Sequence, residues 1–210
     1  MSTSIDTRNW RYATKKFDTT KKISASDLEI ILEAGRLTAS SYGLQPYHIF
    51  VITDPELRAQ LKPASWNQAQ VTDASHLLVI ASQTTFGEEL VDDYINTVSE
   101  TRGVPVADLG GYADFMKSSF ANFSEEQKAE WATKQAYIVL GNLLQVAAEL
   151  NIDSCAMEGF DKAQYNKILG LDAKNLSAAV LLPIGYRSEE DDTQHYAKVR
   201  KSKETLFTHL

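Results

Sequence analysis

The sequence is poor in cysteine and in long apolar runs. Its single cysteine, Cys155, excludes an intrachain disulfide in this chain of 210 residues. Its longest apolar stretch, 176–186, contains Ser177 and Pro183 and is too short for a membrane-spanning helix, which needs about 20 apolar residues. The first residues, Met-Ser-Thr-Ser-Ile-Asp-Thr-Arg, lack the apolar core of an export signal. We therefore expect a cytoplasmic protein that does not enter a membrane.

Several common catalytic and binding motifs are also missing. The sequence has no G-x-G-x-x-G turn and no G-x-x-x-x-G-K-[ST] loop, so the usual backbone cradles for phosphate are absent. No G-x-S-x-G elbow supplies a nucleophile, and Cys155 stands in an apolar segment typical of a small buried residue. The histidines lack metal-ligand spacing, which argues against a metal site. Such a protein most simply takes its chemistry from an organic cofactor.

The chain carries no overall positive charge. Its net charge of −7 argues against a general nucleic-acid-binding protein. The positive residues gather near the two chain ends: residues 1–22 contain six lysines and arginines against two acids, and residues 198–203 contain four without an acid. These two islands are either solvated termini or the two halves of a site for a compact anionic ligand.

The overall composition predicts a globular protein. Hydrophobic residues make up 43% of the chain and charged residues 23%. No repeat, low-complexity tract or Gly/Ser/Pro linker divides it, so we expect a single domain, 1–210. Helix and strand patterns are interspersed without strict β-α-β alternation. This pattern predicts an α+β layer fold with a small sheet buried under helices.

Start signals mark the main helices. Ser26 and Glu29 have capping-box spacing and open a helix in which Gly35 is a small, close-packing position. Ser124 and Gln127 form a second box, from which helical spacing continues to about residue 151; this predicts the longest helix. Further elements are predicted at 161–170 (a helix) and at 48–53, 77–82, 153–157 and 176–185 (strands).

The segment 103–123 has no regular pattern, because three glycines and a proline interrupt its first part. Aromatic rings crowd the second part. They are either the core of a packed helix-loop-helix connection or the face of a mobile flap against a flat substrate. These rings belong to Tyr112, Phe115, Phe120 and Phe123.

Two motifs carry polar and charged side chains suited to an anionic ligand. Arg11-Tyr-Ala-Thr-Lys15-Lys-Phe17-Asp18 places a guanidinium, a planar fork for phosphate oxygens, four residues before a lysine. Ser40-Ser-Tyr-Gly-Leu-Gln-Pro-Tyr-His48 is a polar turn between a helix and a strand. Written as R-x-x-T-K-x-F-D and S-S-x-x-x-Q-P-[YW]-H, the pair resembles the nitroreductase family of FMN-dependent, homodimeric NAD(P)H oxidoreductases. Further blocks of resemblance follow in the family's order at 67–76, 130–137, 157–161, 183–185 and 198–200.

The resemblance implies a nitroreductase-like layer fold, with a small, mostly antiparallel sheet and a long helix at the subunit interface, and a site for non-covalently bound FMN. Arg11, Lys198 and Arg200 would hold the FMN phosphate. Lys15 and Glu158 would be the catalytic residues, Lys15 at the pyrimidine side of the flavin and Glu158 through its main-chain N–H at flavin N5. The further cofactor-binding positions would be Ala13, Asn67, Gln70, Met157 and Gly159, together with Ser40, Ser41 and Gly43 from the partner subunit.

The resemblance also implies an activity. NADH or NADPH would pass hydride to FMN, and a small flat acceptor, a nitroaromatic or a quinone, would then take two electrons from the same pocket by a ping-pong mechanism. The alternatives are a quinone, dihydropteridine or flavin reductase of the same fold, a flavin-binding protein without turnover, and a purely structural helical dimer. No metal, membrane or nucleic acid is expected as a partner. The substrate-facing rings would be Tyr42, Phe115, Phe120 and Phe123.

Some of these residues also fit plainer roles. Asn67 is either a flavin contact or a helix cap, and Gln70 is either a flavin contact or merely exposed. Gln135 is expected to satisfy a polar group at the interface of the long helix. The chain departs from its relatives at Ala13 and Gly43, where many carry Ser and Asn, so two side-chain contacts to the cofactor would be lost.

Overall fold

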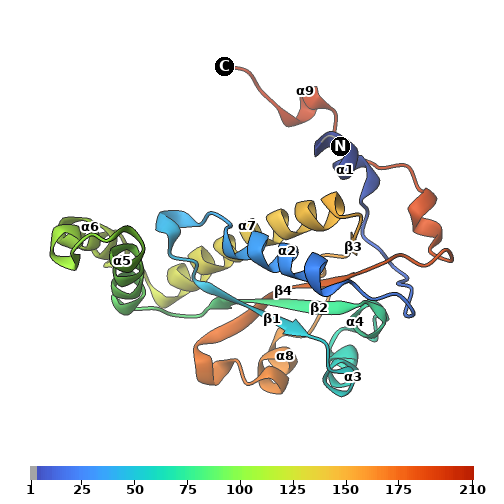
Figure 1. Cartoon of the computed structure of the whole chain (residues 1–210), viewed down its shortest axis with the longest axis horizontal. Helices are drawn as coiled ribbons and strands as arrows, with labels where there is room; N and C mark the ends of the chain where they lie inside the picture. Colours follow the sequence, from blue (N-terminus) through green and yellow to red (C-terminus); the bar gives the residue numbers. More distant parts are fainter. Residues whose placement is uncertain (1–3) are drawn as a thin grey trace.

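The computed structural model describes residues 4–210, and a four-stranded antiparallel sheet with the order β1-β2-β4-β3 lies at its centre (Figure 1). The prediction that the protein is not exported was made from its first eight residues. Of these, residues 1–3 lie outside the described residues. The strands β2 and β4 are buried along almost their whole length, because helices cover both faces of the sheet. The predicted α+β layer fold is confirmed. The strands are β1 (Tyr47–Ile52), β2 (His76–Gln83), β3 (Asp153–Ser154) and β4 (Leu176–Gly185).

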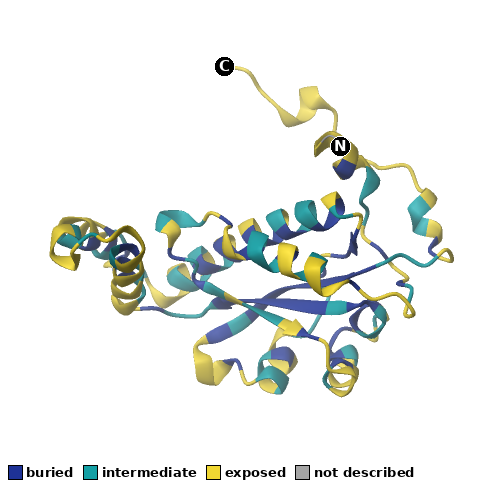
Figure 2. Cartoon of the chain, in the orientation of Figure 1, coloured by how far each residue is buried: buried dark blue, intermediate teal, exposed yellow. Residues whose placement is uncertain are grey.

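Side chains of the central strands alternate between two helical layers. Leu78 and Leu182 face α2 (Ala25–Arg36) and α7 (Glu125–Glu149), whereas Leu77 and Leu181 face α3 (Pro55–Ala64) and α8 (Lys162–Leu169). All four leucines are fully buried, and each contributes about 1.5–3 kcal/mol by leaving water. Two apolar layers, one on each face of the sheet, therefore hold the helices in place. The central strands are mostly buried, whereas the outer sides of the helices are exposed (Figure 2).

The remaining elements are shorter or lie at the edges of these layers. They are α1 (Ser4–Trp10), α4 (Gln70–Asp73), α5 (Glu89–Arg102), α6 (Gly110–Phe120) and α9 (Lys203–Leu206), with the 3-10 turns η1 (Ser41–Gly43), η2 (Val106–Leu109), η3 (Asp172–Lys174) and η4 (Asp192–His195). Within residues 4–210, no helix combines the length and the apolarity that crossing a membrane takes.

One predicted helix start is wrong and two are confirmed. The helix α2 begins earlier than the Ser26 box predicts, because the hydroxyl of Ser24 accepts a hydrogen bond from the N–H of Asp27 at 3.1 Å and so caps the helix. Ser124 and Gln127 form the expected capping box of α7. The helix α8 likewise runs from an Asp161 cap to Gly170.

The helices α2 and α7 pack closely, as the small residue Gly35 predicts. A Cβ at Gly35 would lie 3.3 Å from a methyl carbon of Leu143. Beside this contact, the amide of Asn142 donates to the hydroxyl of Thr38 at 2.6 Å and to the carbonyl of Ala34 at 2.9 Å. Packing and hydrogen bonds together fix the end of α2 and the turn that follows it.

Three strand predictions are confirmed to within a residue or two, and the strand at 153–157 is too long. The observed β3 pairs with β4 only at Asp153 and Ser154. Met157 meets Leu181 again as an isolated bridge. Between these contacts, at Cys155 and Ala156, the regular pairing is interrupted, although the N–H of Cys155 still donates to the carbonyl of Pro183 at 3.1 Å. The segment 155–159 therefore continues along β4 as an irregular loop.

The segment 103–123 belongs to a packed helix pair. The helices α5 and α6 stand at one end of the molecule (green in Figure 1) and have a small core of their own around Met116 and Phe120. Phe120 is buried against Phe86 and Trp131, whereas Phe115 is 58% exposed. The interpretation as a packed connection therefore holds for Phe120. Whether the pair moves as a flap stays a prediction.

Candidate functional site

The N-terminal segment after α1 lies along the short edge of the sheet. The N–H of Thr14 donates to the carbonyl of Ser154 at 3.3 Å, and the N–H of Asp18 donates to the carbonyl of Tyr186 at 2.8 Å. These bonds place residues 11–15 beside β3 and beside the loop 155–159. Two of the predicted site segments are thereby brought together.

Asp191 fixes this segment from the C-terminal side. Its buried carboxylate accepts hydrogen bonds from the N–H of Lys15 at 2.7 Å, the N–H of Lys16 at 3.1 Å and the hydroxyl of Tyr12 at 2.9 Å. Burial alone would raise its pKa, but these bonds and those from Thr193 outweigh burial and lower the pKa to about 2. The sequence gives no signal for this role, because Asp191 stands in an acidic run that is typical of an exposed turn.

Arg187 also attaches the N-terminal segment to the edge of the sheet. Its guanidinium pairs with the buried carboxylate of Asp153 at 2.6 Å and lies 4.3 Å and 4.6 Å from the ring centres of Trp10 and Tyr12. Asp191 and Arg187 together join the two ends of the chain to the same edge of the sheet.

The two cationic islands meet in one pocket. Arg11, Lys198 and Arg200 line a cavity of about 390 Å³ beside Gly141 and Gln145, in the C-terminal half of α7. The ammonium of Lys198 donates to the carbonyl of Arg11. The two islands therefore lie together, while Lys198 and Arg200 remain exposed.

In the part of the chain that the structure describes, the three predicted phosphate ligands of this pocket take part in no ion pair. Burial and then Arg200 lower the pKa of Arg11, and burial, Arg11 and Arg200 lower the pKa of Lys198. The Nε of Arg11 is buried and has no hydrogen-bond partner. Like charges held together around an unused donor are typical of an anion site.

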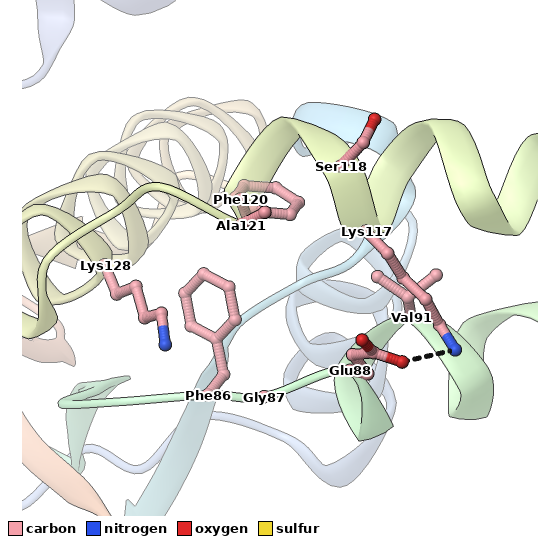
Figure 3. A pocket seen from close by; sticks show the side chains of 9 residues that line it. All are labelled: Phe86, Gly87, Glu88, Val91, Lys117, Ser118, Phe120, Ala121 and Lys128. Carbon is pink, nitrogen blue, oxygen red and sulfur yellow. Dashed lines mark ion pairs between the residues drawn. The ribbon is translucent and has the colours of Figure 1, made fainter.

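A second cavity shows the contrast. It has a volume of about 290 Å³ and lies between Phe86, Phe120 and the start of α7 (Figure 3). Its Lys117 is paired with Glu88 at 3.0 Å and Asp92 at 2.8 Å, and its Lys128 is paired with Glu125 at 2.9 Å. Because its cations are neutralised, this cavity is the weaker candidate for an anionic ligand.

The residues predicted at the flavin ring also lie together. The side-chain amide of Gln68 donates to the carbonyl of Gly159 at 2.8 Å, and a Cβ at Gly159 would lie only 2.7 Å from the ring of Trp66. The turn 66–70 therefore lies against the loop 155–159. Lys15 is near the same loop, because the N–H of its neighbour Thr14 donates to the carbonyl of Ser154 at 3.3 Å. Burial raises the pKa of the Cys155 thiol, and the charge of Lys15 partly offsets this effect.

Two residues of this turn have alternative interpretations, a flavin contact or a plainer role. Asn67 has a φ of 58°, and its N–H caps the end of α3 by donating to the carbonyl of Lys62 at 3.0 Å. Its main chain is thus a helix cap, while its side chain is exposed and available to a ligand. Gln70 is 6% exposed, so the reading of Gln70 as merely exposed is wrong.

The turn around Ser40, Ser41 and Gly43 lies elsewhere in the same chain. The N–H of Ser41 donates to the side-chain carbonyl of Gln135 at 2.8 Å, which confirms the expected role of Gln135. Tyr42 makes T-shaped ring contacts with Phe115 and Phe120 of α6. The α5–α6 pair stands at the other end of the molecule from α1 and the C-terminal tail (Figure 1). Within one chain this turn does not reach the cationic pocket. That the turn contributes to the cofactor site of a partner subunit stays a prediction.

Comparison with known families agrees with this geometry. A model described as "Nitroreductase family" matches residues 9–186. The chain belongs to the nitroreductase family. The match includes the segments around Lys15, Asn67 and Glu158, whereas Lys198 and Arg200 lie beyond it. For those two residues the support comes from the pocket itself.

Relatives and solved structures of this family cover nearly the whole chain. A Staphylococcus epidermidis protein named "Putative NAD(P)H nitroreductase" is 38% identical over 215 residues, which span 98% of this chain and 96% of the relative. A "putative NAD(P)H:FMN oxidoreductase" of Staphylococcus epidermidis matches with a TM-score of 0.88 at 20% identity, over 100% of this chain and 97% of its own. A "putative nitroreductase in complex with FMN" from Exiguobacterium sibiricum matches with a TM-score of 0.84 at 21% identity, over 100% and 98%. The two structures show the nitroreductase fold.

Proposed function

We propose that this protein is an FMN-dependent NAD(P)H oxidoreductase and that the whole chain, 1–210, forms one FMN-binding domain. The observation that carries the proposal is the pocket in which Arg11, Lys198 and Arg200 meet, none of them in an ion pair with another described residue. Family membership and the FMN complex of a relative with the same fold support it.

The pocket fits a phosphate group. A phosphate monoester carries a charge of about −1.5 to −2 at neutral pH and offers oxygens to several donors. The buried, unpartnered Nε of Arg11 would gain an acceptor. Burial is the main cause that lowers the pKa of Arg11 and of Lys198, and the repulsion from neighbouring cations that adds to it would be relieved. Gly141 leaves space above α7, since a Cβ there would meet no atom within 4 Å.

The other residues would serve the flavin ring. When bound, FMN supplies two-electron chemistry, taking hydride from NADH or NADPH and passing electrons to a nitroaromatic or quinone acceptor in alternation. Lys15 would favour negative charge at the pyrimidine side, and the main-chain N–H of Glu158 would donate at N5. Asn67 and Gln70, in the turn beside the loop 155–159, would complete this side of the site.

We further propose a homodimer in which the Ser40–Gly43 turn reaches the cofactor of the other subunit. Large apolar side chains on two parts of the surface support this. Ile30 of α2 and Ile138 of α7 are each 48% exposed, and Leu206 and Phe207 of the C-terminal tail are 62% and 60% exposed. The tail stands off the body of the chain (Figures 1 and 2). A second copy would cover such surfaces.

Titration with FMN tests the cofactor site. We expect Arg11→Gln to weaken FMN binding by about ten- to hundredfold, because a hydrogen bond to a charged group contributes about 1.5–3 kcal/mol. Quenching of FMN fluorescence measures the affinity. Arg102→Gln, on an exposed position of α5, is the matched control. Equal affinities of the two variants would contradict the assignment of the pocket.

Anaerobic titration of the FMN-loaded protein with NADH separates the rival functions. Loss of the yellow colour indicates turnover, persistence of the colour indicates a flavin-binding protein without turnover, and a protein that stays colourless after FMN addition indicates a structural dimer. A comparison of kcat/KM for menadione, a dihydropteridine, free flavin and nitrofurazone then ranks the acceptors. The proposed nitroreductase activity predicts efficient reduction of nitrofurazone or menadione.

A further inference from the structure

A short hydrogen bond joins the long helix to the loop after β3. The hydroxyl of Tyr137 on α7 donates to the carboxylate of Glu158 at 2.5 Å. Partial burial and this hydrogen bond raise the pKa of Tyr137 to about 12, so the hydroxyl keeps its proton throughout the neutral range. Within residues 4–210, the Glu158 carboxylate has no other hydrogen-bond partner.

The main chain is held at the two neighbours of Glu158, and the Glu158 N–H itself donates no hydrogen bond within residues 4–210. Met157 and Leu181 exchange two main-chain hydrogen bonds, at 2.9 Å and 3.0 Å. Gly159 is held by the amide of Gln68 and touches the ring of Trp66. Glu158 itself is exposed between these anchors. The Tyr137 hydroxyl is therefore the contact that sets the direction of the Glu158 side chain.

Tyr137 lies on the side of α7 that lines the cationic pocket. Gly141 and Gln145 of that pocket follow Tyr137 at steps of four residues, so the three residues form one stripe along the helix. At a rise of 1.5 Å per residue, Tyr137 lies about 6 Å along the axis from Gly141. The Tyr137–Glu158 pair thus stands about one turn of α7 away from Gly141 in the wall of the cationic pocket.

We propose that Tyr137 is a positioning residue, which holds the Glu158 carboxylate to one side and thereby keeps the Glu158 main-chain N–H fixed at the flavin. This inference rests on the proposed function, because it names the flavin as the group that the N–H serves. The hydroxyl also partly offsets a full negative charge close to a ring that gains negative charge on reduction. Tyr137 acts through Glu158 and touches no reacting atom in this proposal.

Two variants should act in opposite directions. Tyr137→Phe removes the hydroxyl and leaves the carboxylate uncompensated, so the reduced flavin becomes less stable. Glu158→Gln keeps an oxygen acceptor for Tyr137 and removes the charge, so the reduced flavin becomes more stable. We expect each change to shift the equilibrium between oxidised and reduced flavin by about tenfold, which is about 30 mV for a two-electron couple. The midpoint potential of the FMN-loaded dimer, titrated against reference dyes, measures both shifts.

Hydrogen exchange of the protein without added flavin gives a second, independent measurement. In Tyr137→Phe, amides in the peptide that covers residues 155–160 should exchange several-fold faster, whereas in Glu158→Gln they should exchange at nearly the wild-type rate. Tyr165→Phe is the matched control, because it removes a hydroxyl bonded at 2.6 Å to Ser65 in the core, and burial raises the pKa of Tyr165 also to about 12. It should leave the midpoint potential unchanged.

The outcomes separate this inference from the function on which it rests. Equal potentials of wild type, Tyr137→Phe and Glu158→Gln, or shifts of the same sign in both variants, would overturn the positioning role in a protein that binds and reduces FMN. An unchanged exchange rate at 155–160 in Tyr137→Phe would overturn it as well, whether or not flavin binds. A wild type that takes up no FMN would instead overturn the proposed function.

Discussion

Among single residues, Lys15 bears most directly on the proposed chemistry. Its main chain is held by Asp191, whereas its ammonium is exposed and enters no ion pair within the described chain. A cation about 4 Å from a developing charge contributes on the order of 4 kcal/mol at an effective dielectric of 20. We therefore expect Lys15→Ala to slow the reduction of bound FMN by NADH at least about tenfold, and to weaken FMN binding less. Rapid mixing with NADH measures the reduction rate.

The neighbouring Lys16 provides the control for this experiment. It is also exposed and lies 3.9 Å from Glu190, so Lys16→Ala changes the net charge equally. Only the variant at Lys15 should change the rate of flavin reduction. If both variants reduce bound FMN at the wild-type rate, the electrostatic role of Lys15 is refuted.

Gly141 tests the space above α7. Glycine inside a helix costs about 0.8–1.0 kcal/mol relative to alanine, and a Cβ here would contact nothing within 4 Å. Gly141→Ala should therefore raise the free energy of unfolding of the flavin-free protein by roughly that amount, as measured in urea. If the proposed cofactor lies close to this face, the same methyl should weaken FMN binding. Unchanged FMN affinity would mean that the cofactor stays clear of α7.

Among the elements, the segment 11–16 depends on the turn at Asp191. The folded carboxylate has a pKa of about 2 against an ordinary value of 3.8, so the folded state binds this proton more weakly than the unfolded state. The stabilisation is fully present above about pH 4 and is lost as the pH falls towards 2. At 1.36 kcal/mol per pKa unit, it amounts to about 2 kcal/mol.

Asp191→Asn should remove this contribution. At pH 7 we expect the variant to lose about 2 kcal/mol of stability, and the difference from wild type should shrink as the pH falls from 4 to 2. Urea unfolding over this pH range measures both effects. The exposed neighbour Asp192 supplies the control variant, Asp192→Asn, which should follow the wild-type curve. A difference between wild type and Asp191→Asn that does not depend on pH would contradict the assigned cause.

Local signals in the sequence predict the elements well and their anchoring poorly. Ser124 and Gln127 are sufficient to predict the start of α7, because both partners of the capping box are local. Ser24 and Ser26 are both possible caps for the start of α2. The hydroxyl of Ser24 is the one that accepts from the N–H of Asp27, and residue spacing alone does not reveal this. Asp191 looks like part of an exposed acidic run, because the donors that bury it lie more than 170 residues away.

At the scale of the whole molecule, the site is assembled from parts that are distant in sequence. Composition indicates two cationic islands, and the resemblance assigns them to one phosphate. The contact itself depends on the edge of the sheet at β3, on Asp191 and on Arg187, which no periodicity predicts. The Tyr137–Glu158 hydrogen bond is not predicted from the sequence either, because its two partners lie 21 residues apart on different elements. From the sequence alone, Tyr137 resembles any other exposed residue of α7. Motifs therefore identify the candidate ligands, and tertiary contacts decide which of them meet.

The C-terminal tail carries the last prediction, which concerns the assembly. Leu206 and Phe207 are more than half exposed, yet burying such side chains contributes about 1.5–3 kcal/mol each. In the proposed homodimer these side chains lie against the second copy. We expect the double variant Leu206→Asp, Phe207→Asp to sediment as a monomer. It should also bind FMN more weakly, because the Ser40–Gly43 turn of the partner would no longer reach the pocket.

Analytical ultracentrifugation and FMN titration measure the two effects on the same samples, with Thr208→Asp as the control that adds charge to the tail without removing an apolar side chain. A wild type that is monomeric and still binds FMN tightly would show that one chain completes the site. In that case the turn at Ser41 would have to act through its contact with Gln135 on α7, and not through the cofactor.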